Sequence, residues 1–205
     1  MADVWIKFCG CTSPHDVELA VAAGANAFGM IFAPSPRRVT WQAVSDIASR
    51  VPASIEPVAV FVNPARGEVE KVRSLFPRAW LQFSGNESPE FVANFGERAI
   101  KAIHVDENGT DVAEAAALFP YALLLFDSQH GGLAGGTGKT FSWEHAASLA
   151  KERRVVIAGG LTPENVGSCV ERLRPFGVDV RSGVETDGHK DPAKMRALVR
   201  AVRRV

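Results

Sequence analysis

The chain has 205 residues, and its 23 lysines and arginines balance 23 aspartates and glutamates. A formal net charge of zero gives no reason to expect nucleic acid or a membrane surface as a partner. The sequence shows no signal segment and no apolar stretch of membrane-spanning length, so we expect a soluble, cytoplasmic protein with one domain over residues 1–205.

Eight short apolar runs follow one another along the chain and predict β-strands. They cover residues 4–8, 27–32, 57–62, 79–83, 99–103, 122–126, 154–158 and 177–180. Between them, segments such as 16–27, 41–51 and 194–204 repeat apolar residues at three- and four-residue steps, which is typical of helices with one buried face. Five pairs of an N-cap residue and a proline predict helix starts: Ser13-Pro14, Asn63-Pro64, Ser88-Pro89, Thr162-Pro163 and Asp191-Pro192.

Strand and helix alternate throughout, which favours a parallel α/β fold. Eight such units in about two hundred residues are near the lower size limit of a closed (β/α)8 TIM barrel. The alternative is an open, doubly wound sheet of about five to seven strands. No G-x-G-x-x-G motif follows the first run, so the sequence favours the single-domain barrel.

Cys9 ends the first apolar run, directly before Gly10. Ligands meet the C-terminal strand ends of a parallel barrel, so a thiol there is a candidate base or nucleophile. The alternative is a small buried side chain, as most free cysteines are. The cysteines Cys9, Cys11 and Cys169 are odd in number and lack the partners of a zinc site, so we expect reduced thiols and no metal.

Several polar residues interrupt or end the apolar runs, and side chains two positions apart on a strand share a face. These residues are Lys7, Gln82, Ser84, Lys101, Asp127, Asp179 and Arg181. Because an apolar helix layer accommodates them poorly, we expect them inside the barrel or at its mouth. Lys7, Gln82 and Lys101 could simply pair with one another, whereas Asp127 precedes a glycine-rich segment and is expected to face a substrate.

Two loops are suited to phosphate. Gly159 and Gly160 follow the seventh run, and Ser182 and Gly183 follow the eighth. Glycines let backbone N–H groups approach an anion, and in barrels phosphate commonly lies between the loops after strands seven and eight. The alternative is that these glycines only form turns.

The longest glycine-rich stretch, residues 131–140, ends like a nucleotide P-loop. Its spacing does not fit, because a Walker motif needs a glycine at the position of Leu133. We expect a lid over the active site there, with Lys139 in it.

Seven motifs in order resemble phosphoribosylanthranilate isomerase of tryptophan biosynthesis. They are KFCGCT at residues 7–12 with Asp16, FAPSPR at 32–37, VFVN at 60–63, FDS at 126–128, GGTGKTF at 135–141, GGL at 159–161 and SGVE at 182–185. Each motif is weak alone, but the ordered set spans the chain and is specific.

The resemblance implies a cofactor-free Amadori rearrangement of a phosphorylated small molecule. Asp127 matches the general acid that opens the furanose ring, and Cys9 matches the general base that removes the C2′ proton. A base needs a thiol pKa below that of a free cysteine, to which Lys7 on the same face would contribute. No nucleic-acid or membrane partner is implied, and monomer or homodimer stays open.

The resemblance also implies the binding residues. Arg37 matches the residue that holds the anthranilate carboxylate, and Asp179 matches a carboxylate near the substrate's amino group. The phosphate loops supply Gly159, Gly160, Ser182 and Gly183.

Three features depart from the family pattern. Ser84 stands where a histidine is common, and Arg181 replaces a small serine and is expected to reach Asp179 or the phosphate. The segment before Arg37 is one residue short, which leaves Arg38 as the alternative anchor. The five histidines, His15, His104, His130, His145 and His189, are expected in helices and loops as solvated or capping residues.

Two other functions remain. A barrel isomerase acting on a histidine-pathway ribonucleotide would use two aspartates at opposite strand ends, and Cys9 argues against it. A non-catalytic binding barrel would keep the phosphate loops but would need neither Cys9 nor Asp127.

Overall fold

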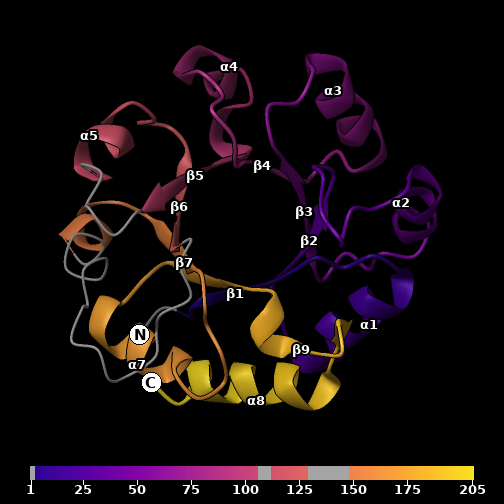
Figure 1. Ribbon diagram of the computed structural model, residues 1–205, viewed down its shortest axis with the longest axis vertical. Coiled ribbons are helices and arrows are strands. Elements are labelled where there is room, and N and C mark those ends of the chain that lie inside the picture. The colour runs from indigo at the N-terminus through magenta and orange to yellow at the C-terminus, as the bar shows by residue number, and fades with distance from the viewer. Residues whose placement is uncertain (1–2, 106–111, 129–147) are drawn as a thin grey trace.

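The structure is a computed structural model that describes residues 3–105, 112–128 and 148–205. Eight parallel strands form a closed barrel in which each strand pairs with its neighbours in sequence and β8 pairs with β1 (Figure 1). The strands are β1 (Trp5–Cys9), β2 (Ala27–Ile31), β3 (Glu56–Phe61), β4 (Trp80–Phe83), β5 (Ala99–Val105), β6 (Leu123–Ser128), β7 (Val155–Ala158) and β8 (Gly177–Val180). The predicted (β/α)8 barrel is confirmed.

Helices cover the outside of the barrel (Figure 1). They are α1 (Pro14–Ala23), α2 (Trp41–Ala48), α3 (Arg66–Leu75), α4 (Pro89–Ala93), α5 (Val112–Ala117), α7 (Val166–Leu173) and α8 (Pro192–Arg203), with 3₁₀ turns η1 (Gly96–Arg98) and η2 (Ser182–Val184). A small antiparallel hairpin, β9 (Glu185–Thr186) and β10 (His189–Lys190), was not expected and separates β8 from α8. No helix of the described ranges is long and apolar enough to cross a membrane.

Three of the five predicted helix starts are confirmed. Ser13, Ser88 and Asp191 cap α1, α4 and α8, and each side chain accepts a backbone N–H of the first turn. Each is followed by proline at the start of the helix, where the missing N–H costs nothing.

The other two predictions are wrong. Asn63 adopts a left-handed φ of 48° and its side chain accepts the N–H of Asn86, so α3 starts only after Ala65. Thr162 is held by Asn165, whose Oδ1 accepts its N–H at 2.8 Å, and α7 begins after Asn165. The side chain of Asn63 thus serves a loop contact instead of a helix cap, and that of Thr162 accepts the N–H of Glu164 in the turn before α7.

Two apolar cores lie on the two faces of the barrel wall. The larger joins the outward side chains of the strands to the helices, and the smaller fills the barrel itself. Members of the inner core include Ala27, Val58, Ile100, Leu125 and Val156, which alternate along their strands with outward residues. Strand phase therefore decides which side chains reach the barrel interior.

Aromatic rings fill the N-terminal end of the barrel. Trp5 packs edge-on against Trp80 at 6.3 Å between ring centroids and stacks on Phe176 at 6.0 Å. These residues start β1 and β4 and precede β8, and the Nε1 of Trp5 donates to Glu56 at the same end. A ligand is therefore expected at the opposite, C-terminal end of the strands.

Candidate active site

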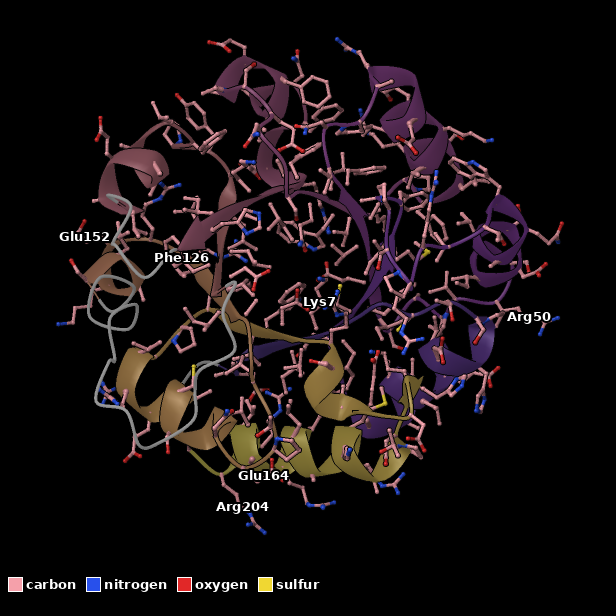
Figure 2. All side chains as sticks on the ribbon, in the orientation of Figure 1. Lys7, Arg50, Phe126, Glu152, Glu164 and Arg204 are labelled. Atoms are coloured by element: carbon pink, nitrogen blue, oxygen red, sulfur yellow. The ribbon has the colours of Figure 1, made fainter. Side chains whose placement is uncertain are left out.

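An ion pair lies in the interior of the barrel. Lys7 is fully buried, and its Nζ donates to Oδ2 of Asp179 at 2.6 Å and to Oε1 of Gln82 at 3.0 Å. Lys7 and Asp179 are register partners on β1 and β8, which is why the two side chains meet (Figure 2 shows Lys7 within the ring of strands). Burial alone would lower the pKa of Lys7, but Asp179 and, after it, Cys9 favour the charged ammonium, and the pKa is raised. The interior position expected for these three residues is confirmed.

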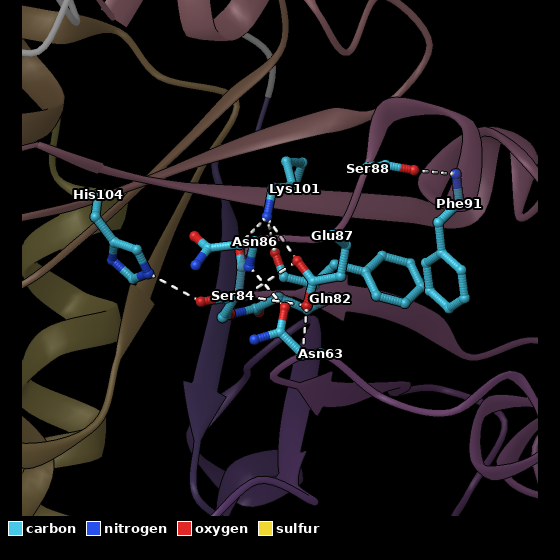
Figure 3. Close-up of polar contacts among 11 residues, drawn as sticks. Asn63, Gln82, Ser84, Asn86, Glu87, Ser88, Phe91, Lys101 and His104 are labelled. Carbon is cyan, nitrogen blue, oxygen red and sulfur yellow. Dashed lines mark hydrogen bonds and ion pairs between the residues drawn. The ribbon is translucent and has the colours of Figure 1, made fainter.

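Lys101 does not lie in the barrel interior, contrary to expectation. It alternates with Ile100 and Ala102, which belong to the inner core, so its side chain leaves the barrel toward the loop after β4. There its ammonium pairs with Glu87 at 2.7 Å and donates to the carbonyl of Gly85 (Figure 3). A buried charge outside the barrel is tolerated because a carboxylate and carbonyl oxygens surround it.

Cys9 lies at the C-terminal end of β1, and its side chain belongs to the inner core. Its carbonyl oxygen accepts a hydrogen bond from Nζ of Lys190 at 2.6 Å. Burial raises the pKa of the Cys9 thiol, although the nearby ammonium groups of Lys7 and Lys190 act to lower it. The expected lowering of the Cys9 pKa is therefore wrong, because desolvation of the thiolate exceeds the help from the two lysines.

Asp127 lies on β6, near its C-terminal end. Its register partners are His104 on β5 and Ala158 on β7, and it continues the inward phase of Leu123 and Leu125. The side chain is partly buried, and burial followed by the charge of Asp179 raises the pKa of the Asp127 carboxyl. A carboxyl group with a raised pKa is suited to donate a proton.

His104 stands in β5, and so the expectation that it is a solvated or capping residue of a helix or loop is wrong. Its Nε2 lies 2.9 Å from the carbonyl oxygen of Ser84 (Figure 3). The sequence carried a signal for this position, because His104 continues the alternation of Ile100 and Ala102 by one step beyond the predicted strand end. His15 and His189 are exposed, as expected, although His189 lies in the strand β10 and not in a helix or loop; His130 and His145 lie outside the described residues.

Arg37 reaches the mouth of the barrel from the loop after β2. Its Nη2 donates to Oε2 of Glu185 at 3.1 Å, and Glu185 accepts from Lys190 at 2.8 Å through its other oxygen. A Cβ added to Gly10 would lie 3.4 Å from Cγ of Arg37, which places the arginine directly beside the segment that follows Cys9. Arg38 is exposed, which supports the preference for Arg37. Lys190, which supports both Cys9 and Glu185, was missed because it belongs to the unexpected hairpin.

The two glycine loops after β7 and β8 meet. Gly159 and Gly160 take left-handed φ values of 86° and 63°, which favour glycine. A Cβ on Gly183 would overlap the carbonyl oxygen of Leu161, so this glycine is required for the close approach of the loops. Ser182 and Gly183 form η2, and no long helix begins directly after them, because the hairpin intervenes before α8. The close backbone approach of these two loops is therefore the basis for an anion site here.

Arg181 is exposed beside the same loop, and its side chain approaches Gly10. Among the described residues it forms no ion pair with Asp179, which is bound by Lys7 instead. The glycine-rich stretch 131–140, with Lys139, lies outside the described residues. In the described part of the chain, no group of three or more His, Cys, Asp or Glu side chains could hold a metal ion.

Comparisons with known proteins identify the family. The family described as N-(5'phosphoribosyl)anthranilate (PRA) isomerase matches residues 6–201. The N-(5'-phosphoribosyl)anthranilate isomerase of Desulforudis audaxviator is 40% identical over 198 residues, which cover 97% of this chain and 97% of the relative. The crystal structure of phosphoribosyl anthranilate isomerase from Thermotoga maritima superposes with a TM-score of 0.85 at 33% identity and covers 98% of this chain and 100% of that chain.

A further solved structure is the isomerase in complex with reduced 1-(o-carboxyphenylamino)-1-deoxyribulose 5-phosphate. It superposes with a TM-score of 0.84 at 31% identity and covers 98% of this chain and 100% of that chain. The chain thus belongs to the N-(5'-phosphoribosyl)anthranilate isomerase family, whose members are enzymes of tryptophan biosynthesis.

Proposed function

We propose that this chain converts N-(5'-phosphoribosyl)anthranilate to 1-(2-carboxyphenylamino)-1-deoxyribulose 5-phosphate, with Asp127 as general acid and Cys9 as general base. The observation that carries the proposal is a carboxyl group on β6 and a thiol on β1, both inward-facing and near the C-terminal strand ends. That end of the barrel is opposite the N-terminal end, which the aromatic rings of Trp5, Trp80 and Phe176 fill.

In the first step, Asp127 donates its proton to the furanose ring oxygen. The C1′–O bond breaks as the nitrogen lone pair forms a Schiff base, and Asp127 is left as a carboxylate. The raised pKa of Asp127, caused by burial and by the charge of Asp179, supports this role because it keeps a proton available closer to neutral pH.

In the second step, the Cys9 thiolate removes the proton from C2′. The electron pair of that C–H bond moves toward the iminium carbon and gives an enolamine, which tautomerises to the ketone. Burial raises the Cys9 pKa, so the thiolate is the scarcer form, and the ammonium groups of Lys7 and Lys190 are the charges that favour it. The overall reaction is an isomerisation, so protons taken and given cancel over one turnover.

The proposed binding roles follow from the charge of each group and from the hydrogen-bonding atoms that it has left for a substrate. Arg37 supplies a planar guanidinium for the anthranilate carboxylate, and its contact with Glu185 holds it beside Gly10. Asp179 keeps Oδ1 buried and without a hydrogen-bond partner among the described residues, which supports an interaction with the substrate's amino group. The phosphate is assigned to backbone N–H groups of Gly159, Gly160 and Gly183, with Ser182 nearby.

The test is the loss of substrate fluorescence when the purified protein meets freshly made N-(5'-phosphoribosyl)anthranilate. Cys9→Ser and Asp127→Asn should each lower turnover by roughly 10²–10⁴-fold, the usual contribution of a general acid or base. Cys169→Ser is the matched thiol control, because that cysteine lies in α7, away from the barrel interior, and should keep its turnover. Near-normal turnover of either site variant would overturn the assignment of that residue.

A further inference from the structure

The imidazole of His104 has one nitrogen engaged and the other unpaired. Its Nε2 lies 2.9 Å from the Ser84 carbonyl oxygen, and since a carbonyl only accepts, Nε2 carries the hydrogen and donates it (Figure 3). Its Nδ1 is buried and has no hydrogen-bond partner in the described part of the chain. A buried polar atom without a partner is uncommon and points to a role that a fold contact does not explain.

His104 stands beside the proposed general acid. Its register partner on the neighbouring strand is Asp127, and paired residues of adjacent strands project to the same face. The two side chains also interact electrostatically, because the positive form of His104 lowers the pKa of Asp127. The other charges that act on Asp127 are Asp179 on β8, which raises its pKa, and Arg181 and Lys7, which lower it.

We propose that His104 is a positioning residue for Asp127, which orients the carboxyl group and stabilises the carboxylate left after proton donation. When the imidazole is protonated, Nε2–H donates to Ser84 and Nδ1–H is free to donate to Asp127. This inference rests on the proposed function, in which Asp127 is the general acid.

Two variants separate the two nitrogens. His104→Gln keeps an amide donor near the position of Nε2, for Ser84, but removes Nδ1 and the positive charge. His104→Asn places an amide nitrogen near the position of Nδ1 but removes the hydrogen bond to the Ser84 carbonyl. His15→Gln is the control, because that histidine is 73% exposed on α1.

For His104→Gln we expect kcat to fall roughly 10- to 100-fold, the loss of one hydrogen bond to a charged group, with a KM within about 2-fold. His104→Asn should retain more kcat than His104→Gln. If His104 only held Ser84, the order would be reversed, and that order or a normal kcat in His104→Gln would overturn the proposal.

A direct titration of Asp127 adds a measurement, its pKa, that would not change if His104 had only a structural role. In carboxyl-labelled protein, with the Asp127 signal assigned by its absence in Asp127→Asn, ¹³C NMR should show the Asp127 pKa higher in His104→Gln than in the parent and in His15→Gln. An unchanged or lowered Asp127 pKa would contradict the proposal. Unfolding by urea should give similar stability for all of these variants.

A double variant distinguishes failure of this inference from failure of the proposed function. In an Asp127→Asn background, His104→Gln should lower kcat by less than about 2-fold further, because His104 acts through Asp127. A full additional loss would overturn the coupling. Normal turnover of Asp127→Asn alone would instead overturn the proposed general acid.

Discussion

The ammonium of Lys7 lies 2.6 Å from the carboxylate of Asp179, and both side chains are buried in the barrel. The pair places opposite charges next to Cys9, which follows Lys7 by two residues on the same strand face. Of these charges, Lys7 favours the Cys9 thiolate and Asp179 opposes it. The ion pair therefore couples the stability of the barrel to the acidity of the proposed base.

Removing one partner of this pair should destabilise the fold strongly. Lys7→Met leaves Asp179 as a buried charge without its cation and should lower the free energy of unfolding by about 3–5 kcal/mol at neutral pH. Arg73→Ala is the control, because its pair with Glu70 is exposed and should contribute at most about 1 kcal/mol. Urea unfolding measures both, and a loss below about 1 kcal/mol for Lys7→Met would show that the pair is not what stabilises this region.

The choice of Arg37 as carboxylate anchor predicts an asymmetry between two adjacent arginines. Arg37→Ala should weaken binding of the reduced product analogue by roughly 1.5–3 kcal/mol, the range for hydrogen bonds to charged groups. Arg38→Ala should change it by no more than about 0.5 kcal/mol, because its side chain is exposed. Calorimetric titration of both variants measures the difference, and an equal or larger loss at Arg38 would reverse the assignment.

The strand positions were predictable because each strand of a parallel barrel is a local apolar run. The same counting of alternate residues placed Lys7, Gln82 and Asp179 inside, since phase depends only on position along the strand. The prediction for Lys101 was wrong because it rested on the cost of burying a charge and not on strand phase, which points its side chain outward. The partner that removes this cost is Glu87, in a loop whose path no local pattern reveals.

Two site residues were missed for physical reasons. His104 continues an apolar strand with a polar side chain, so the predicted strand stopped one residue before it. Lys190 donates a hydrogen bond to the Cys9 carbonyl from a two-residue strand, which is too short to show an alternating pattern in the sequence. The lowered pKa expected for Cys9 was wrong because the degree of burial, which dominates it, is a property of the assembled barrel.

The buried thiols should make stability depend on pH. Burial raises the pKa of Cys169 to about 12, whereas an unfolded thiol ionises near about 8.5. Between these values the unfolded chain binds fewer protons than the folded chain, so stability falls as pH rises. Each such thiol contributes a slope of up to about 1.4 kcal/mol per pH unit.

Urea unfolding between about pH 8.5 and 10.5 tests this dependence. Cys169→Ala should flatten the decline of stability with pH by up to about 1.4 kcal/mol per unit. Val170→Ala, at the next buried position of α7, should lower stability equally at every pH without changing the slope. Parallel curves for the parent and Cys169→Ala would contradict the raised thiol pKa.

The meeting of the loops after β7 and β8 predicts where an anion binds. A side chain on Gly183 would overlap the Leu161 carbonyl, so Gly183→Ala should push the loops apart and raise KM by roughly 10-fold or more, the loss of a hydrogen bond to a charged phosphate. Gly67→Ala is the matched control: nothing lies within 4 Å of its added Cβ, and alanine in the α3 helix should stabilise it by about 0.5–1 kcal/mol with no change in KM.

Crystals soaked in phosphate locate the anion directly. We expect it on the backbone N–H groups of Gly160 and Gly183 with Ser182 close by, because these loops approach each other without intervening side chains. Gly183→Ala crystals soaked in the same way should lose it. An anion held instead by Lys139 and the N–H groups of Gly135 and Gly136, with the two short loops empty, would show that the glycine-rich stretch after β6 binds the phosphate.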